Sequence, residues 1–121
     1  MQHIDWFEIP STDFGRASRF YESVFDCELK SDRFGSFPMG IFTSPSGEGV
    51  GCVIQGEPYA PGPDGTVIYL NGGVSIDKVL ARIEPAGGRV VLGKTELPDN
   101  LGYIAHFIDT EGNRLGLHTM A

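Results

Sequence analysis

The chain has 121 residues and a formal net charge of −7, with 40% hydrophobic and 21% charged residues. This length and composition predict one globular domain with its own core, and no apolar run is long enough to span a membrane. The nine basic residues are scattered along an acidic chain. That pattern excludes a nucleic-acid-binding surface, which needs clustered positive charge.

Two further features bear on the compartment. The start of the chain, MQHIDWFEIP, has no basic region followed by an apolar stretch, so we expect no secretory signal. The two cysteines, Cys27 and Cys52, form neither a CxxC pair nor a zinc-binding pattern, and we expect both to be reduced and partly buried. These features together predict a cytoplasmic protein.

The first half of the chain reads as strand, helix and three strands. Residues 4–9 predict a strand that ends at Pro10, and Ser11 or Thr12 is suited to cap the helix that follows. The apolar residues of this helix fall at i, i+3, i+4 and i+7, which is typical of one buried face. They are Ala17, Phe20, Tyr21 and Val24. The predicted strands are 27–33, 37–43 and 50–55, with a turn at 44–47 between the last two.

The second half repeats this order after a linker. The stretch GEPYAPGPDG, residues 56–65, is too rich in proline and glycine to form a helix or a central strand. A strand is predicted at 66–70, and Ser75 is suited to cap the second helix. Its buried face is predicted as Ile76, Val79, Leu80 and Ile83. Strands are then predicted at 89–95, 102–108 and 114–118, with a turn at 109–112.

The repeat defines the domain organisation. We predict a single α+β domain, residues 1–121, made of two βαβββ modules. The first module covers about 1–56, the linker about 57–65, and the second module about 66–121.

Three stretches carry a resemblance to a known family. They are WFEIPSTDFGRASRFYESVF near the start, AGGRVV after the second helix, and FIDTEGNRLGLH at the end. With these stretches in this order, the chain resembles the vicinal oxygen chelate superfamily. That superfamily includes glyoxalase I, extradiol dioxygenases and bleomycin- and fosfomycin-resistance proteins. The resemblance implies two modules whose curved mixed sheet surrounds a cleft, and it implies a homodimer, with modules either side by side or swapped.

The resemblance also implies where metal ligands would stand. Metal-dependent members place one ligand on the first strand and one on the last strand of each module. Counted from the helix-opening Asp13 and the turn residue Asp109, and matched across the repeat, these places hold Trp6, Gly51, Thr66 and Gly116. None of these residues is a usual ligand for a divalent ion. We therefore expect the four ligand places of the family to be lost.

The two glycines leave two interpretations open. In the first, Gly51 and Gly116 open the floor of the cleft while Trp6 fills part of it, which makes an apolar pocket. In the second, both glycines only ease sheet curvature or close packing.

Strand alternation predicts which residues face the cleft. The predicted cleft set is Trp6, Glu8, Gly51, Val53, Gln55, Thr66, Ile68, Leu70, Arg114, Gly116 and His118. The opposite, helix-facing set is Phe7, Ile9, Val50, Cys52, Ile54, Val67, Tyr69, Leu115 and Leu117. The second set is almost wholly apolar, as a face packed on two helices should be.

Four polar members of the cleft set are candidates for chemistry. Arg114 is suited to hold a carboxylate or phosphate, and His118 to exchange a proton. Glu8 is suited to act as a base, or to form an ion pair with Arg114. Glu8, His106 and His118 together would make the one remaining combination of metal ligands.

Three functions follow as hypotheses. The first is a metal-free protein that binds a small, partly apolar molecule in the cleft, with candidate residues Trp6, Glu8, Gly51, Gln55, Thr66, Arg114, Gly116 and His118. The second is an enzyme of the superfamily, similar to a lactoylglutathione lyase or a dioxygenase, with a non-standard metal site or metal-free acid–base chemistry. The third is a small module without a ligand.

Overall fold

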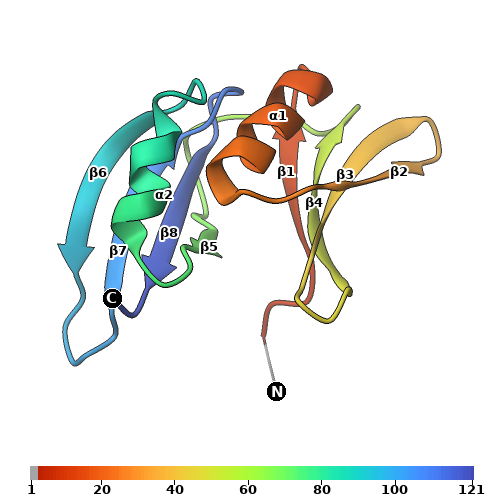
Figure 1. Ribbon diagram of the computed structural model, residues 1–121. Coiled ribbons are helices and arrows are strands. Elements are labelled where there is room, and N and C mark those ends of the chain that lie inside the picture. Colours follow the sequence, from red (N-terminus) through yellow and green to blue (C-terminus); the bar gives the residue numbers. More distant parts are fainter. Residues whose placement is uncertain (1–2) are drawn as a thin grey trace.

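The computed structural model describes residues 3–121 and contains the two predicted modules (Figure 1). The first two residues of the predicted first module lie outside the described residues. The first module comprises β1 (Phe7–Ser11), α1 (Phe14–Phe25), β2 (Lys30–Phe34), β3 (Phe37–Thr43) and β4 (Gly49–Gln55). The second comprises β5 (Tyr69–Asn71), α2 (Ile76–Ile83), β6 (Arg89–Glu96), β7 (Tyr103–Ile108) and β8 (Arg114–Thr119). The predicted α+β fold of two βαβββ modules is confirmed.

Each module forms its own four-stranded mixed sheet. The strand orders are β1-β4-β3-β2 and β5-β8-β7-β6. The first strand of each module pairs in parallel with the last strand, and the other pairs are antiparallel. Residues 56–68, between the two sheets, contain no helix or strand, and the predicted linker lies inside this segment.

Several boundaries differ from the prediction. β1 continues through Pro10 to Ser11, because β1 is an edge strand and a missing N–H is tolerated there. β2 begins only at Lys30, since α1 ends at Phe25 and Asp26 adopts the left-handed conformation. β5 has three residues and begins at Tyr69 rather than at residue 66. The other strands lie within one residue of their predicted ends.

Both helices bury the predicted faces, except that Leu80 of α2 is only partly buried, and their caps differ from the prediction. The buried residues are Ala17, Phe20, Tyr21 and Val24 in α1, and Ile76, Val79 and Ile83 in α2. The cap of α1 is Asp13, whose carboxylate accepts a hydrogen bond from the Arg16 N–H at 3.0 Å. Ser11 instead donates its hydroxyl to the Ile54 carbonyl at 2.9 Å, inside the first sheet. Ser75 does precede α2, but its side chain makes no capping hydrogen bond.

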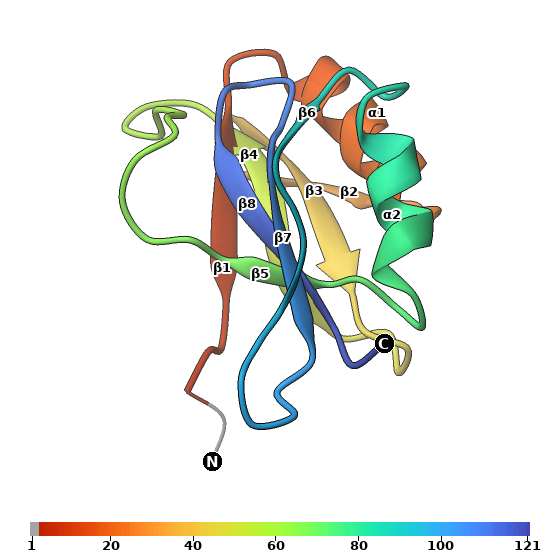
Figure 2. The ribbon, with the colours of Figure 1, turned by 90° about the vertical axis from the view of Figure 1, so that its left-hand side faces the viewer.

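The two helices lie next to each other on one side of the molecule, with α2 across β7 and β8 of the second sheet and α1 towards the first sheet (Figures 1 and 2). Aromatic rings of α1 contact both sheets, because Tyr21 packs against Phe42 of β3 at 5.7 Å between ring centroids and Phe20 against Phe107 of β7 at 5.9 Å. The inner face of each sheet therefore meets the helices, and we call the opposite faces the outer faces. Among the described residues, no helix has the length and apolar character needed to cross a membrane.

The turn between β7 and β8 joins the two modules. Asp109 is 4% exposed, and its carboxylate accepts hydrogen bonds from the Tyr21 hydroxyl at 2.7 Å, from the Asn113 amide nitrogen at 3.0 Å, and from the backbone N–H groups of Glu111 and Asn113. The aspartate that opens the turn is therefore a structural residue, because four donors from the turn and from α1 converge on it.

Glu111 holds the start of α1 from the same turn. Its carboxylate accepts hydrogen bonds from the backbone N–H groups of Thr12 and Asp13, both at 2.8 Å, and from the Arg16 Nε at 2.7 Å. Burial of Glu111 favours the neutral acid, but the hydrogen bonds from Arg16, Asp13 and Thr12 outweigh this effect. They lower the pKa of Glu111 from 4.5 to about 2.

This lowered pKa predicts a dependence of stability on pH. The folded pKa of Glu111 lies below its unfolded value, so its contribution is present above pH 4.5 and is lost as the pH falls towards 2. We expect Glu111→Gln to be less stable than wild type at neutral pH and to lose less additional stability between pH 4.5 and 2. Urea unfolding at a series of pH values measures both effects. The exposed Glu48 supplies the control, and a Glu48→Gln variant that behaved like Glu111→Gln would contradict this account.

Candidate functional site

The outer face of the second sheet carries the predicted residues of β8. Leu115 and Leu117 are buried in the core, so Arg114, Gly116 and His118 lie on the opposite, outer face. His106 of β7 pairs with Gly116, and Ile104 of β7 pairs with His118. The side chains of His106 and Ile104 therefore lie on that same outer face. Tyr69 of β5 pairs with Gly116 from the other side. Gly116 therefore lies between a tyrosine and a histidine.

The Tyr69 ring covers Gly116. A Cβ atom added at Gly116 would have three ring atoms of Tyr69 as its nearest neighbours, closer than carbon atoms approach without a clash. The interpretation in which Gly116 opens the floor of a cleft is therefore wrong, and the close-packing interpretation is right. A glycine is present in β8 because any side chain would displace the tyrosine.

Tyr69, His106 and Arg114 form a hydrogen-bonded cluster across Gly116. The Tyr69 hydroxyl lies 2.5 Å from His106 Nε2, and a terminal nitrogen of Arg114 lies 3.1 Å from His106 Nδ1. Burial lowers the pKa of His106, and the positive charge of Arg114 lowers it further. Tyr69 is 41% exposed, so the cluster is open to molecules outside the chain.

The pairing of β5 with β8 corrects the prediction of which residues near β5 face the cleft. Tyr69 lies on the outer face, whereas Ile68 and Leu70 pack against the core. Thr66 lies before β5, in the irregular segment. The prediction placed this strand one residue out of phase with β8, and a one-residue shift moves every side chain to the other face.

A β-bulge likewise corrects the prediction of which β4 residues face the cleft. Thr43 pairs with Gly49 and Phe42 with Gly51, which leaves Val50 without a partner and shifts the alternation by one residue. Gly51, Val53 and Gln55 consequently lie on the inner face.

Contacts on this strand agree with the shifted register. The ring of Phe7 covers Gly51, and the Gln55 side-chain oxygen accepts a hydrogen bond from the Phe14 N–H at the start of α1, at 2.7 Å. Cys52 and Ile54 take the outer face in their place. The predicted cleft role of Gly51 and Gln55 within this sheet is therefore not supported by their positions.

The outer face of the first sheet carries its own polar group. Glu8 pairs in register with Cys52, and the Trp6 indole N–H donates to the Glu8 carboxylate at 3.4 Å. Cys52 is buried while Cys27 is exposed, and both are free thiols. Burial and the nearby Glu8 raise the pKa of Cys52 to about 12, so this thiol stays protonated. Glu8 also raises the pKa of the Tyr59 hydroxyl.

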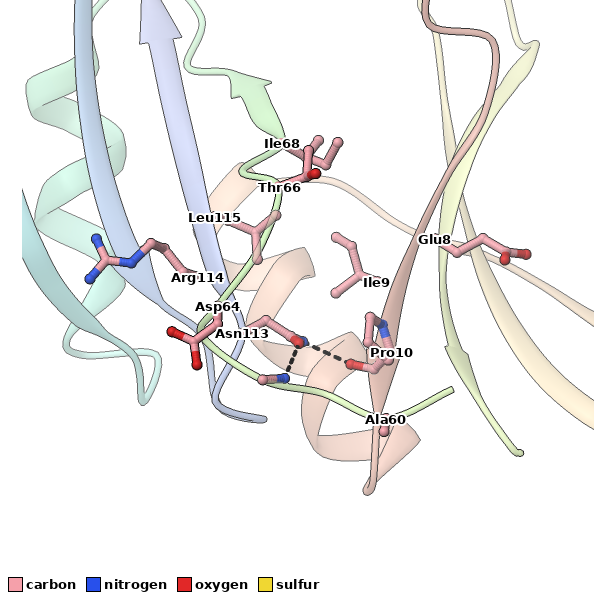
Figure 3. A pocket seen from close by; sticks show the side chains of 11 residues that line it. Glu8, Ile9, Pro10, Ala60, Asp64, Thr66, Ile68, Asn113, Arg114 and Leu115 are labelled. Carbon is pink, nitrogen blue, oxygen red and sulfur yellow. Dashed lines mark hydrogen bonds between the residues drawn. The ribbon is translucent and has the colours of Figure 1, made fainter. Parts of the chain in front are cut away.

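Glu8 and Arg114 do not meet within one chain. Figure 3 shows that their side chains point away from each other, with Ile9, Ile68 and Leu115 between them. These apolar residues line a cavity of about 240 Å³ at the junction of the modules. Asn113 closes one end of it, because its side chain donates to the Pro10 carbonyl at 2.8 Å and accepts from the Gly62 N–H at 3.1 Å. Among residues 3–121, the predicted ion pair between Glu8 and Arg114 is absent.

The predicted metal combination of Glu8, His106 and His118 is also not brought together within one chain. His118 Nε2 lies 2.6 Å from the Leu101 carbonyl, His106 contacts Tyr69 and Arg114, and Glu8 belongs to the other sheet. In the described part of the chain, no three His, Cys, Asp or Glu side chains are arranged to hold a metal ion. Of the four residues that the family resemblance implied as ligand places, Gly51 lies on the inner face and Thr66 lies outside β5, and the four offer only an indole, a hydroxyl and two glycines. These side chains do not fit a divalent cation.

Tyr69 is a site residue that the sequence pattern did not predict, since alternation placed it on the helix-facing side. The signal was present in the glycine itself, because a glycine inside a strand often marks the close approach of another group. An aromatic residue on the neighbouring strand was the natural candidate for that group.

The paired modules and their outer faces define the class of protein. The chain belongs to the Glyoxalase/Bleomycin resistance protein/Dioxygenase superfamily, whose family model matches residues 3–117. A glyoxylase-like domain-containing protein of Didymella fabae is 31% identical over 120 residues, which cover 91% of this chain and 88% of that protein.

Solved structures share the fold at low sequence identity. A glyoxylase/bleomycin resistance protein/dioxygenase domain from Frankia sp. EAN1pec has a TM-score of 0.72 and 18% identity, covering 98% of this chain and 97% of that one. The fosfomycin resistance protein FosX of Listeria monocytogenes has a TM-score of 0.69 and 15% identity, covering 98% and 93%. At these identities the likeness shows the fold alone.

Proposed function

We propose that the protein binds a small, partly apolar molecule on the outer face of the second sheet, without a divalent metal at the ligand places of its family. The observation that carries this proposal is the Tyr69 ring over Gly116. Where the family resemblance places a ligand side chain, this chain has a tyrosine that is hydrogen-bonded to a histidine. The ring supplies apolar contact area, the Tyr69 hydroxyl and Arg114 supply polar contacts, and His106 holds both of them.

A second copy of the chain is proposed to complete the binding cleft. Glu8 on the outer face of the first sheet and Arg114 on the outer face of the second point away from each other, so the two outer faces of one chain do not cover one another (Figure 3). Trp6 on the first sheet is 42% exposed, and Tyr69 on the second is 41% exposed. In a homodimer with exchanged modules, the first sheet of one copy would cover the second sheet of the other. Trp6 and Glu8 would then approach the cluster around Gly116.

A metal-free enzyme is the second candidate function. The contact of Tyr69 with His106 favours it, because a hydrogen-bonded pair of titratable side chains beside an open face is suited to acid–base chemistry. If the protein catalyses a reaction, alanine at position 106 should abolish turnover while a bound ligand remains detectable.

Metal analysis tests the first proposal. We expect protein purified without a metal-binding tag, and then incubated with nickel, zinc, iron or manganese, to retain far less than one ion per chain. We also expect a thermal-shift screen of small aromatic and anionic compounds to give ligands whose stabilisation is unchanged by a chelator. His106→Ala and His3→Ala form a matched pair, since His3 lies outside the cluster. About one ion per chain that is lost only with His106→Ala would contradict the proposal.

A further inference from the structure

Among residues 3–121, Arg114 forms no ion pair with a carboxylate. The ion pairs among residues 3–121 are Arg16 with Glu111 and Lys94 with Asp77. Asp64 and Glu8 line the same cavity as Arg114, yet neither forms an ion pair with it. This is notable in a chain whose net charge is −7, where carboxylates outnumber basic groups. One terminal nitrogen of Arg114 contacts His106, and the other N–H donors of the guanidinium remain available.

The contact between Arg114 and His106 determines which ring nitrogen of His106 carries the proton. A guanidinium has only donors, so His106 Nδ1 must be the acceptor and carries no proton. In the neutral ring the proton then lies on Nε2 and is donated to the Tyr69 oxygen. The Tyr69 hydroxyl therefore accepts a hydrogen bond from His106 and does not donate its own hydrogen to that ring. Within the described residues it has no other acceptor, so it is free to be donated outward from the sheet.

From this arrangement we propose that the Tyr69–His106–Arg114 cluster binds the oxyanion of a small organic acid. This inference rests on the proposed function. The guanidinium of Arg114 takes the carboxylate or phosphonate group, and the Tyr69 hydroxyl donates to a second oxygen of the same molecule. His106 is a positioning residue, because it holds both donors and does not itself contact the ligand. The apolar part of the molecule lies beside the tyrosine ring.

The geometry sets the size of this ligand. The two donors lie on opposite sides of one imidazole ring, so the ring and two hydrogen bonds, of 2.5 Å and 3.1 Å, separate them. A single carboxylate is too narrow to reach both. The molecule that satisfies the cluster therefore carries its acid group and a separate acceptor, such as a carbonyl oxygen, a few bonds apart.

The acid-binding part of the inference, the contact with Arg114, is tested by comparing benzoate, its neutral counterpart benzamide, and inorganic phosphate as probes. Their binding is measured by calorimetry and by NMR at fixed ionic strength. We expect both anions to bind wild type more tightly than benzamide. Arg114→Gln should weaken benzoate binding by about tenfold or more, since ion-paired hydrogen bonds are the stronger ones. Arg19→Gln removes the same charge from the exposed surface of α1 and should leave binding unchanged.

Two further measurements separate the outcomes. The ¹⁵N signals of His106 should show a protonated Nε2 and an unprotonated Nδ1, and a proton on Nδ1 would overturn the inference. If benzamide binds the cluster as tightly as benzoate, the inference fails while the proposed function stands. If no anion binds wild type but benzoate binds Glu8→Gln, then Glu8 of a second copy neutralises Arg114, which also overturns the inference. Binding of phosphate without benzoate would also contradict the inference, which requires an organic acid to bind.

Discussion

Replacing Asp109 by alanine should lower the free energy of unfolding by about 3 kcal/mol or more, because each buried donor left without an acceptor costs ~1–3 kcal/mol. The carboxylate of Asp109 is almost fully buried and accepts four hydrogen bonds. One donor, Tyr21, belongs to the first module, so the substitution loosens the contact of α1 with the second sheet as well as the turn. Equilibrium unfolding in urea, followed by circular dichroism, measures the change.

Tyr21→Phe provides the matched comparison for Asp109→Ala. This variant removes one of the four hydrogen bonds and keeps the ring in the core, so we expect a loss of about 1–2 kcal/mol. Burial raises the pKa of Tyr21 well above 10, and Asp109 raises it further, so the hydroxyl keeps its proton and remains a donor at all ordinary pH values. Equal losses for the two variants would show that the hydrogen bonds inside the turn contribute nothing.

The helices were predictable from sequence because the spacing of the apolar residues in a helix indicates which face is buried. Ala17, Phe20, Tyr21 and Val24 fall on one side of α1 whatever they pack against, and the structure buries all four. The β-strands carry weaker information, since alternation reports a face only once the register is known. The bulge that leaves Val50 unpaired lies between two glycines, a signal that does not give the resulting register, and it moves Gly51 to the inner face.

The contacts of the turn were not predictable, for a different reason. Asp109 opens the turn as predicted, but its partner Tyr21 lies 88 residues earlier in the chain. Glu111 likewise contacts Thr12 across 99 residues. No periodicity within either segment indicates such a pair, because the pairing depends on how α1 is placed against the two sheets. The same holds for the cluster, whose members Tyr69, His106 and Arg114 come from three strands.

Gly116→Ala should destabilise the protein by about 1–3 kcal/mol, the usual effect of adding a methyl group where no space exists. The nearest atoms to the new Cβ all belong to the Tyr69 ring. The ring must therefore move away and release His106. In a Tyr69→Ala background the clash is gone, and the same substitution should stabilise by about 0.5–1 kcal/mol, because alanine is favoured over glycine in a strand interior. A double-mutant cycle measured by urea unfolding gives the difference.

Gly93→Ala is the control for this cycle. Gly93 lies in β6 of the same sheet, and a Cβ added there would meet no atom within 4 Å. We expect it to stabilise slightly in both backgrounds, which excludes a general effect of Tyr69→Ala on glycine substitutions. A Gly116→Ala effect that is the same with and without Tyr69 would mean that the glycine serves sheet curvature alone. Packing against the Tyr69 ring would then not explain why β8 contains a glycine. A large coupling would instead identify Gly116 as the residue that allows a tyrosine to stand where the family resemblance places a metal ligand.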